Sequence, residues 1–540
     1  MTEGLQPPRT VVLPEGAPPP GADAVDIKGD GAFDLPGTTS GATVMRGGIW
    51  TAVSRMIPQV YTLIISLVAA RFLGPDGMGR QSFIAFVELS TMQLFTGGLS
   101  LGMMRNIGEA LGAGRAGAVR AIISWGWRLQ AIGCVGGVLV LGGAAAFGAE
   151  PTAAWVLAAV ACFMGVMHTV PSAVLIGMQR WRDASIVGLV TGSIAVPATI
   201  AVLAAGGGIA GIFAVEAATT TMNLIWTTRL ARRSLDGLGD GNHDPGSDYK
   251  RQIVRYTLAT TVTMVLGLIV YRRSEFFFLE HYSTNSEIAF YSIAFSAMSA
   301  VVLLPEAFGG ALAPAIATLV GAGDHERIRS GYSRALRLAI MAALPLTAAI
   351  MTLVPPLIEL VYGRAYADTR GILIIMAIIF PILPLLNMGN GLMLGLGKMR
   401  VPVIASFVAA FVNVGLDFAL IPDHAAKGAA VANAAAQTTV AVILVLYIWR
   451  LLGGIVLRPL PIVLSALASA AAAAAALAVL AAAGTGVPGV IAASVAFVLA
   501  LLGAGRILRF LPSDDAAWLT ENIRGRGRKP LARLSRLLSG

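Results

Sequence analysis

The sequence predicts an all-α integral membrane protein with about fourteen transmembrane helices, arranged as two pseudo-symmetric six-helix bundles plus a C-terminal helix pair. Composition is the first reason, because hydrophobic residues make up 56% of the 540 positions and charged residues only 13%. That balance is too apolar for a soluble globular protein. Apolar stretches of about 20 residues, the length that crosses a bilayer core, recur along nearly the whole chain. In lipid such segments must be helical, because every backbone polar group needs an internal partner.

An internal repeat is the second reason. A shift of about 209 residues places Ile84–Phe86 on Ile293–Phe295, and a shift of about 218 places Gly177–Arg182 on Gly395–Arg400. Two homologous halves are typical of secondary transporters, which hold a substrate site near the middle of the membrane between them. The repeat therefore predicts two equivalent bundles.

The segments follow in order along the chain. Residues 1–45 are rich in proline and acidic side chains, which predicts a disordered cytoplasmic tail. We then expect an N-terminal six-helix bundle over 46–232, a cytoplasmic linker over 233–250, a C-terminal six-helix bundle over 251–452, helices 13 and 14 over 453–511, and a basic amphipathic cytoplasmic tail over 512–540. The leucines of this tail recur at helical spacing among arginines, which favours a helix lying on anionic lipid over a merely solvated tail.

The net charge of +10 is explained by membrane topology. Lysine and arginine concentrate in alternate loops, as the positive-inside rule requires, and this pattern predicts a multi-pass protein with both termini in the cytoplasm. The basic excess therefore does not indicate nucleic-acid binding.

Several motifs are set aside. Gly112–Gly117 spells GxGxxG but falls between two predicted membrane helices, not after a strand. Gly397-Lys398 lacks the first glycine and the Ser or Thr of a phosphate-binding loop, so no ATPase is predicted and transport must draw on a gradient or the membrane potential. The histidines show no metal-ligand spacing, and Cys134 and Cys162 fall within spans. We expect no enzyme activity, cofactor or metal.

Ionisable side chains within membrane spans carry the functional signal, because each costs roughly 2.5 to 3.5 kcal/mol on insertion scales. The predicted spans contain eight of them: Arg55, Glu88, Glu216, Arg272, Arg273, Glu275, Glu306 and Asp417. The three arginines are candidates for a cationic cavity that binds a headgroup phosphate. The five carboxylates are candidates for coupling to a cation or proton. The alternative is structural pairing, for instance of Glu275 with Arg273, that only holds helices together.

Prolines within the spans predict kinks, since proline removes a helix hydrogen bond. The pair Pro381 and Pro384 is the densest example.

Several short runs resemble the polysaccharide and O-antigen flippases of the multidrug/oligosaccharidyl-lipid/polysaccharide (MOP) exporter superfamily. They are Ala70–Pro75 with Gly79, Val361–Tyr366, Gly397–Arg400 and Asn413–Asp417, followed by Leu420–Pro422 and Lys427–Ala430. The resemblance covers about residues 45 to 510. It implies translocation of a lipid-linked oligosaccharide from the cytoplasmic to the outer leaflet by alternating access, for cell-surface polysaccharide biosynthesis.

The resemblance also implies where the cargo binds. Its pyrophosphate would be held in a central cavity by arginines, for which Arg55 and Arg272 or Arg273 are the matching positions. The family often has an aspartate where Glu275 stands. The resemblance further implies a bacterial cytoplasmic (inner) membrane location, with a polysaccharide polymerase and glycosyltransferases as partners.

Two other functions stay open. A cation-coupled multidrug exporter of the same fold usually stops at twelve spans and tends toward acidic, aromatic cavities. A membrane glycan polymerase or ligase is expected to carry a long outer loop with catalytic residues, and no outer loop here is long enough.

Overall fold

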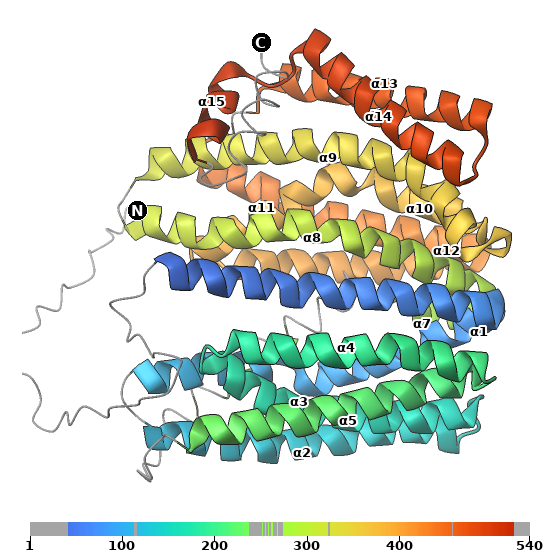
Figure 1. Cartoon of the computed structure of the whole chain (residues 1–540). Helices are drawn as coiled ribbons and strands as arrows, with labels where there is room; N and C mark the ends of the chain where they lie inside the picture. The colour runs from blue at the N-terminus through green and yellow to red at the C-terminus, as the bar shows by residue number, and fades with distance from the viewer. Residues whose placement is uncertain are drawn as a thin grey trace, which may run out of the picture.

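The computed structural model describes residues 41–112, 116–236, 274–321, 324–455 and 457–522, with isolated positions between 251 and 267. Side chains of residues 41–59 and 300–311, and of a few shorter stretches, lie outside this description. Within this description the secondary-structure elements are helices. Their axes are roughly aligned with one another across the molecule (Figure 1).

The first bundle contains five helices. They are α1 (Gly41–Gly112), α2 (Ala116–Ala146), α3 (Thr152–Gly177), α4 (Trp181–Ala204) and α5 (Gly208–Leu235). The long α1 supplies two crossings, because two glycines interrupt its helical geometry: Gly74 at φ 69° and Gly97 at φ 27°. Only glycine adopts such positive φ angles at little cost.

The second bundle contains the helices from α7 to α12. They are α7 (Glu275–Tyr282), α8 (Asn285–Gly321), α9 (His325–Tyr362), the 3-10 turn η1 (Arg364–Tyr366), α10 (Thr369–Ile378), the 3-10 turn η2 (Phe380–Ile382), α11 (Leu383–Gly395) and α12 (Arg400–Leu451). The α9 helix begins where the side chain of Asp324 accepts a hydrogen bond from the backbone of Arg327 at 3.0 Å, a standard N-cap. The kink predicted at Pro381 and Pro384 is confirmed as the break at η2.

The predicted C-terminal helix pair is present as α13 (Pro459–Ala483) and α14 (Val487–Leu508), which pack on each other and on α9. A short helix, α15 (Ser513–Asn522), follows. It lies at the end of the array where α9 begins, so the pair is attached to the second bundle and not to the first (Figure 1).

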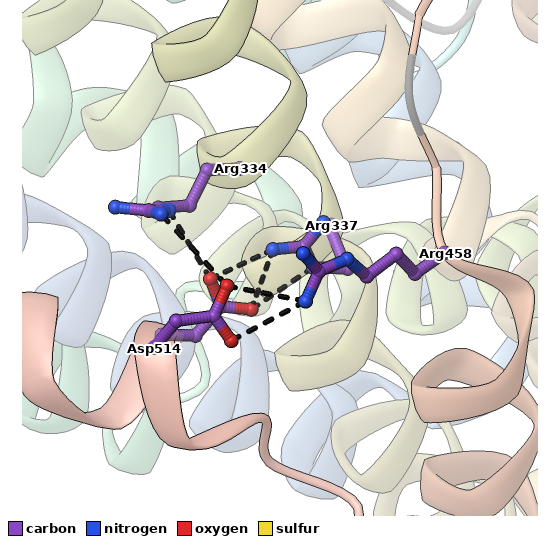
Figure 2. Close-up of polar contacts among 5 residues, drawn as sticks. Arg334, Arg337, Arg458 and Asp514 are labelled. Carbon is purple, nitrogen blue, oxygen red and sulfur yellow. Dashed lines mark hydrogen bonds and ion pairs between the residues drawn. The ribbon is translucent and has the colours of Figure 1, made fainter.

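A cluster of charges holds α15 in place (Figure 2). Arg337 on α9 donates two-pronged hydrogen bonds of 2.7 to 2.9 Å to Asp515, and both side chains are buried. Arg334 adds a 3.2 Å contact to Asp515, while Arg458 reaches Asp514 at 3.1 Å. Because each buried charge is matched, these five residues, here called the clasp, fasten the end of the chain to the second bundle.

Membrane crossing is supported by length and composition. Among the described residues ten helical segments are long and apolar enough to span a bilayer. Two of them have 52 residues each, about 78 Å at 1.5 Å per residue, which is enough for two crossings. One of the two is α12, interrupted at Ala425 with φ 45°. The all-helical membrane fold predicted from the sequence is confirmed.

The predicted repeat is confirmed at one turn of each bundle. At the end of α3, the backbone N–H of Arg180 bonds to the carbonyl five residues earlier at 2.8 Å, and Lys398 does the same after α11 at 2.9 Å. The preceding residue is left-handed in both, Gln179 at φ 59° and Gly397 at φ 69°. This is the Schellman type of helix end, and the two copies are 218 positions apart, the shift found in the sequence.

The two bundles meet mainly through α1, which contacts α7, α8, α9 and η1 (Figure 1). We call the end of the array that carries the turns at Gly74, Gly148, Gly363 and Gly484 the distal face, and the end near α15 the proximal face. On the predicted topology the distal face is extracytoplasmic. The remaining terminal predictions concern 1–40 and 523–540, which lie outside the described residues.

Candidate functional site

The structure brings four of the eight predicted ionisable residues into two separate sites, one in each bundle. Glu275 and Asp417 lie together in the second bundle, and Glu88 and Glu216 in the first. Arg272 and Arg273 are outside the described residues. The side chains of Arg55 on α1 and Glu306 on α8 are outside them too. The cationic cavity predicted from these arginines therefore remains a prediction.

The second-bundle site is a compact acid–amide cluster formed by Glu275, Asn413, Asp417 and Asn433. Glu275 begins α7, and the other three lie on the two arms of α12. The side-chain amide of Asn413 donates to Glu275 at 3.3 Å and to Asp417 at 3.1 Å. The amide of Asn433 donates to Glu275 at 2.8 Å. Both carboxylates are 0% exposed, so the cluster is dry.

The cluster holds two acidic groups, and Arg272 and Arg273, which immediately precede α7, lie outside the described residues. Asp417 keeps one carboxylate oxygen, Oδ1, without a hydrogen-bond partner, and no lysine or arginine forms an ion pair with either acid in the described part of the chain. Burying an unpaired charge is costly, so such a group is neutralised by a proton or a bound cation. Carboxylate and amide oxygens are the ligands that hard cations prefer. The arrangement suits reversible binding of a small cation or proton.

Two neighbours shape this cluster from outside. Ser274 lies 3.1 Å from the amide of Asn413, and Gln437 donates to the side-chain oxygen of Asn433 at 2.6 Å. Because Asn433 is held from one side by Gln437, its amide is directed at Glu275. The cluster is thus positioned by α12 on both sides of the α7 terminus.

The first-bundle site is an open cavity of about 550 Å³ lined by α1, α3 and α5. Its acidic groups are Glu88 on α1 and Glu216 on α5, and His168 on α3 lines it as well. The other polar lining residues are Gln93, Thr96, Ser100, Thr169, Ser172 and Thr220. No lysine or arginine is among the lining residues that the structure describes.

The first-bundle cavity differs from the cluster in its access to water. Glu88 is 6% exposed, whereas Glu216 is exposed and lines the cavity. A cavity of this volume could hold a small organic molecule or several waters, and its acidic lining would favour a cationic guest.

Sequence reasoning missed the amides. Asn413 enters the sequence analysis only as part of the run Asn413–Asp417, and Asn433 does not enter it at all. The spacing of Asn413 and Asp417, four residues apart on one helix face, could have identified them as neighbours. Asn433 and Gln437 repeat that spacing on the second arm of α12. No sequence pattern joins the two arms to the start of α7, since that juxtaposition is tertiary.

Comparison with known proteins shows which transporters share this fold. A model of the MatE family matches residues 258–419, and no curated protein matches the chain in sequence. An inward-facing multidrug resistance MATE family transporter of the MOP superfamily superimposes with a TM-score of 0.64 at 16% identity, covering 75% of this chain and 98% of its own. An outward-facing structure of such a transporter gives 0.51 at 14% identity, covering 76% and 95%.

The lipid II flippase MurJ, in an inward closed conformation, superimposes with a TM-score of 0.66 at 14% identity. This match covers 86% of the present chain and 98% of the flippase. At such identities the likeness defines the fold. The molecule is a multi-pass membrane protein with the fold of the MOP-superfamily transporters, a fold shared by multidrug exporters and by a lipid flippase.

Proposed function

We propose that the protein is a flippase that moves a lipid-linked anionic saccharide across the membrane by alternating access of its two bundles. The observation that carries the proposal is the helix pair α13–α14, clasped to the second bundle by Arg337 and Asp515. The flippase structure covers 86% of the chain and the exporter structure 75%, although each is covered to 98% itself. The flippase structure therefore covers a further 11% of this chain, which is about the length of α13 and α14 with their connections.

The proposed cargo has a pyrophosphate headgroup. One arginine near a phosphate contributes about 4 kcal/mol at 4 Å and an effective dielectric of 20. On this proposal Arg55 and Arg272 or Arg273 hold that headgroup, as the family resemblance implies. The lipid tail would stay in the bilayer beside the apolar outer faces of α13 and α14, where Leu467, Val495 and Leu499 are exposed.

The proposed coupling site is the acid–amide cluster. A cation or proton bound between Glu275 and Asp417 would neutralise the buried charges and change the energy of moving α7 against α12. The two carboxylates and their amides would suit a proton or a monovalent cation such as sodium. Glu88, Glu216 and Glu306 are then secondary candidates for coupling or charge pairing.

A second candidate function is a cation-coupled exporter of organic cations. The specific observation in its favour is the acidic first-bundle cavity, whose Glu88 and Glu216 would attract a positively charged molecule. A polymerase or ligase has no comparable support.

Transport into vesicles distinguishes the two candidates. The purified protein is reconstituted into liposomes and given a fluorescent saccharide linked by pyrophosphate to a polyprenyl lipid, or a fluorescent organic cation such as ethidium. A flippase moves the lipid-linked saccharide between leaflets and does not accumulate ethidium. Ethidium accumulation without saccharide movement would establish the exporter. A lipid without pyrophosphate is the matched control for the role of the headgroup.

The proposal also places the protein in the bacterial cytoplasmic membrane, with its termini in the cytoplasm, alongside glycosyltransferases and a polysaccharide polymerase. Anionic lipid would bind the basic tail.

A further inference from the structure

Two sequence runs that resemble one family, Ala70–Pro75 and Val361–Tyr366, come together in space although they are about 290 residues apart. The first ends the first arm of α1 in one bundle. The second ends α9 and forms η1 in the other bundle. Both lie at the distal face, where the two bundles meet (Figure 1).

Arg71 joins them through the end of α9. Its Nε donates to the carbonyl of Val361 at 2.7 Å, and a terminal nitrogen donates to the carbonyl of Leu360 at 2.9 Å. These carbonyls belong to the last turn of α9, where no backbone N–H of the helix can reach them and where the helix dipole is negative. An arginine from one bundle therefore caps a helix of the other.

Tyr366 makes the reciprocal contact. Its hydroxyl donates to the carbonyl of Ala70 at 2.9 Å, and its side chain is 2% exposed. Burial raises the pKa of Tyr366 to about 12, so the hydroxyl stays protonated and remains a donor at physiological pH. Each bundle thus supplies a donor to backbone carbonyls of the other.

A close backbone contact lies beside these hydrogen bonds of Arg71 and Tyr366. A Cβ atom added to Gly79 would lie 1.7 Å from the carbonyl oxygen of Asn285, at the start of α8. A backbone atom cannot move aside as a side chain can, so only glycine permits the second arm of α1 to approach α8 this closely. The closed arrangement at the distal face depends on this glycine.

An aromatic layer continues the closure toward the membrane interior. Phe86 on α1 stacks on Phe276 of α7 with ring centroids 5.0 Å apart, and Phe83 meets Phe277 edge-on at 6.3 Å. Phe86 and Phe276 are 5% and 0% exposed. This layer adds apolar contacts between the bundles.

We propose that Arg71, Gly79 and Tyr366 form the distal gate of the transporter, and that opening to the distal side requires Arg71 to leave the end of α9. The closer fit to the inward-facing exporter, with a TM-score of 0.64 against 0.51 for the outward-facing structure, agrees with a closed distal face. The gate rests on alternating access and is independent of the identity of the cargo.

Distances between spin labels test the gate directly. Labels are attached to cysteines introduced at Phe147, in the turn after α2, and at Val487, at the start of α14, in a chain whose Cys134 and Cys162 are replaced by alanine. Both label sites are exposed and away from the gate. Double electron–electron resonance on the full chain in lipid nanodiscs then reports the separation of the bundles at the distal face.

The wild-type chain should show mainly the short, closed distance. Arg71→Ala removes two hydrogen bonds from a charged donor, and Gly79→Ala inserts a methyl group against backbone. Each should raise the ratio of open to closed molecules by about tenfold or more. Arg71→Lys, which keeps the charge but cannot match both carbonyls, should lie between wild type and Arg71→Ala.

Matched controls separate the gate from general effects. Arg364→Ala removes an exposed arginine of η1, and Gly188→Ala adds a methyl group to α4 where nothing lies within 4 Å. Both should leave the distances as in the wild type. Unchanged distances in both Arg71→Ala and Gly79→Ala would overturn the proposal, as would an equal shift in Arg364→Ala. A vesicle assay without saccharide movement would count against the flippase and leave the gate standing.

Discussion

The two bundles descend from one repeated unit, yet they handle buried acid in different ways. The first places a buried Glu88 and an exposed Glu216 around an open cavity of about 550 Å³, where water can reach Glu216. The second encloses Glu275 and Asp417 completely and surrounds them with amides. A hydrated acid can exchange protons without moving the protein, whereas a dry acid changes the energy of its surroundings when its charge changes. The second bundle is therefore the better place for coupling.

The repeat makes this contrast sharper. The shift of 218 places Glu216 on Ala434, next to Asn433, so neighbouring places in the two bundles carry an acid in one and an amide in the other. The amide in the second bundle donates to Glu275, while the acid in the first faces the cavity.

The largest effect is expected at the clasp, where the buried Asp515 is fully paired with arginine, unlike the acids of the two sites. Arg337→Ala leaves Asp515 buried without its main partner and should destabilise the protein by about 3 to 5 kcal/mol. Arg458→Ala removes a contact whose arginine is 55% exposed and should cost less than about 1 kcal/mol. Thermal unfolding in detergent measures both. Equal losses in the two variants would contradict the special role of burial.

The next effect concerns the dry cluster. Asp417→Asn removes one of two charges that would bind a cation, and cation affinity should fall roughly a hundredfold, equivalent to about 2.8 kcal/mol. Sodium binding to the purified protein, followed by isothermal titration, measures it. Glu280→Gln, which neutralises an exposed acid on the same short helix, is the matched control and should bind as the wild type does. Unaltered binding in Asp417→Asn would exclude the cluster as the cation site.

A smaller effect is expected from the amides. Asn433→Ala removes the 2.8 Å hydrogen bond to Glu275 but leaves both carboxylates, so cation affinity should fall by about tenfold. The same titration measures it. Thr438→Ala lies one turn further along α12 and bonds only within its own helix, so it serves as the control. A loss as large as that of Asp417→Asn would mean that the amide itself is a main ligand.

The smallest effect is expected in the first-bundle cavity. Glu216→Gln alters a group that water already reaches, so saccharide flipping should stay within about threefold of the wild type. Flipping in vesicles measures it, with Asp183→Asn as the comparison, because Asp183 is a partly buried acid in the first turn of α4 that pairs with Arg180. A much larger loss would make the cavity part of the transport site and favour the exporter.

Composition and repetition were sufficient to predict the helical membrane fold, the paired bundles and the C-terminal helix pair. The length of an apolar segment that spans the membrane is set by the thickness of the bilayer, so it can be read from the sequence. The repeat is visible in residues such as Gly177–Arg182, whose turn recurs in the second bundle. The sequence also marked the buried acids, because charge within a span is rare.

Other features depend on tertiary structure that no local pattern encodes. The grouping of Glu275 with Asn433 requires α12 to bend back past α7, and no sequence pattern indicates that Glu88 and Glu216 line one cavity. The helix α15 was hidden in a segment whose basic residues suggested only a lipid-binding tail. Its two aspartates, Asp514 and Asp515, find partners more than 50 residues away.

Flipping driven by a cation gradient tests the central claim most directly. Vesicles containing the protein receive a pyrophosphate-linked fluorescent saccharide, and an inward or outward gradient of sodium ions or protons is imposed at fixed membrane potential. The wild type should flip the saccharide faster in the direction that one gradient favours, and Asp417→Asn should lose that dependence. Flipping that is the same in both proteins and indifferent to either gradient would contradict the account.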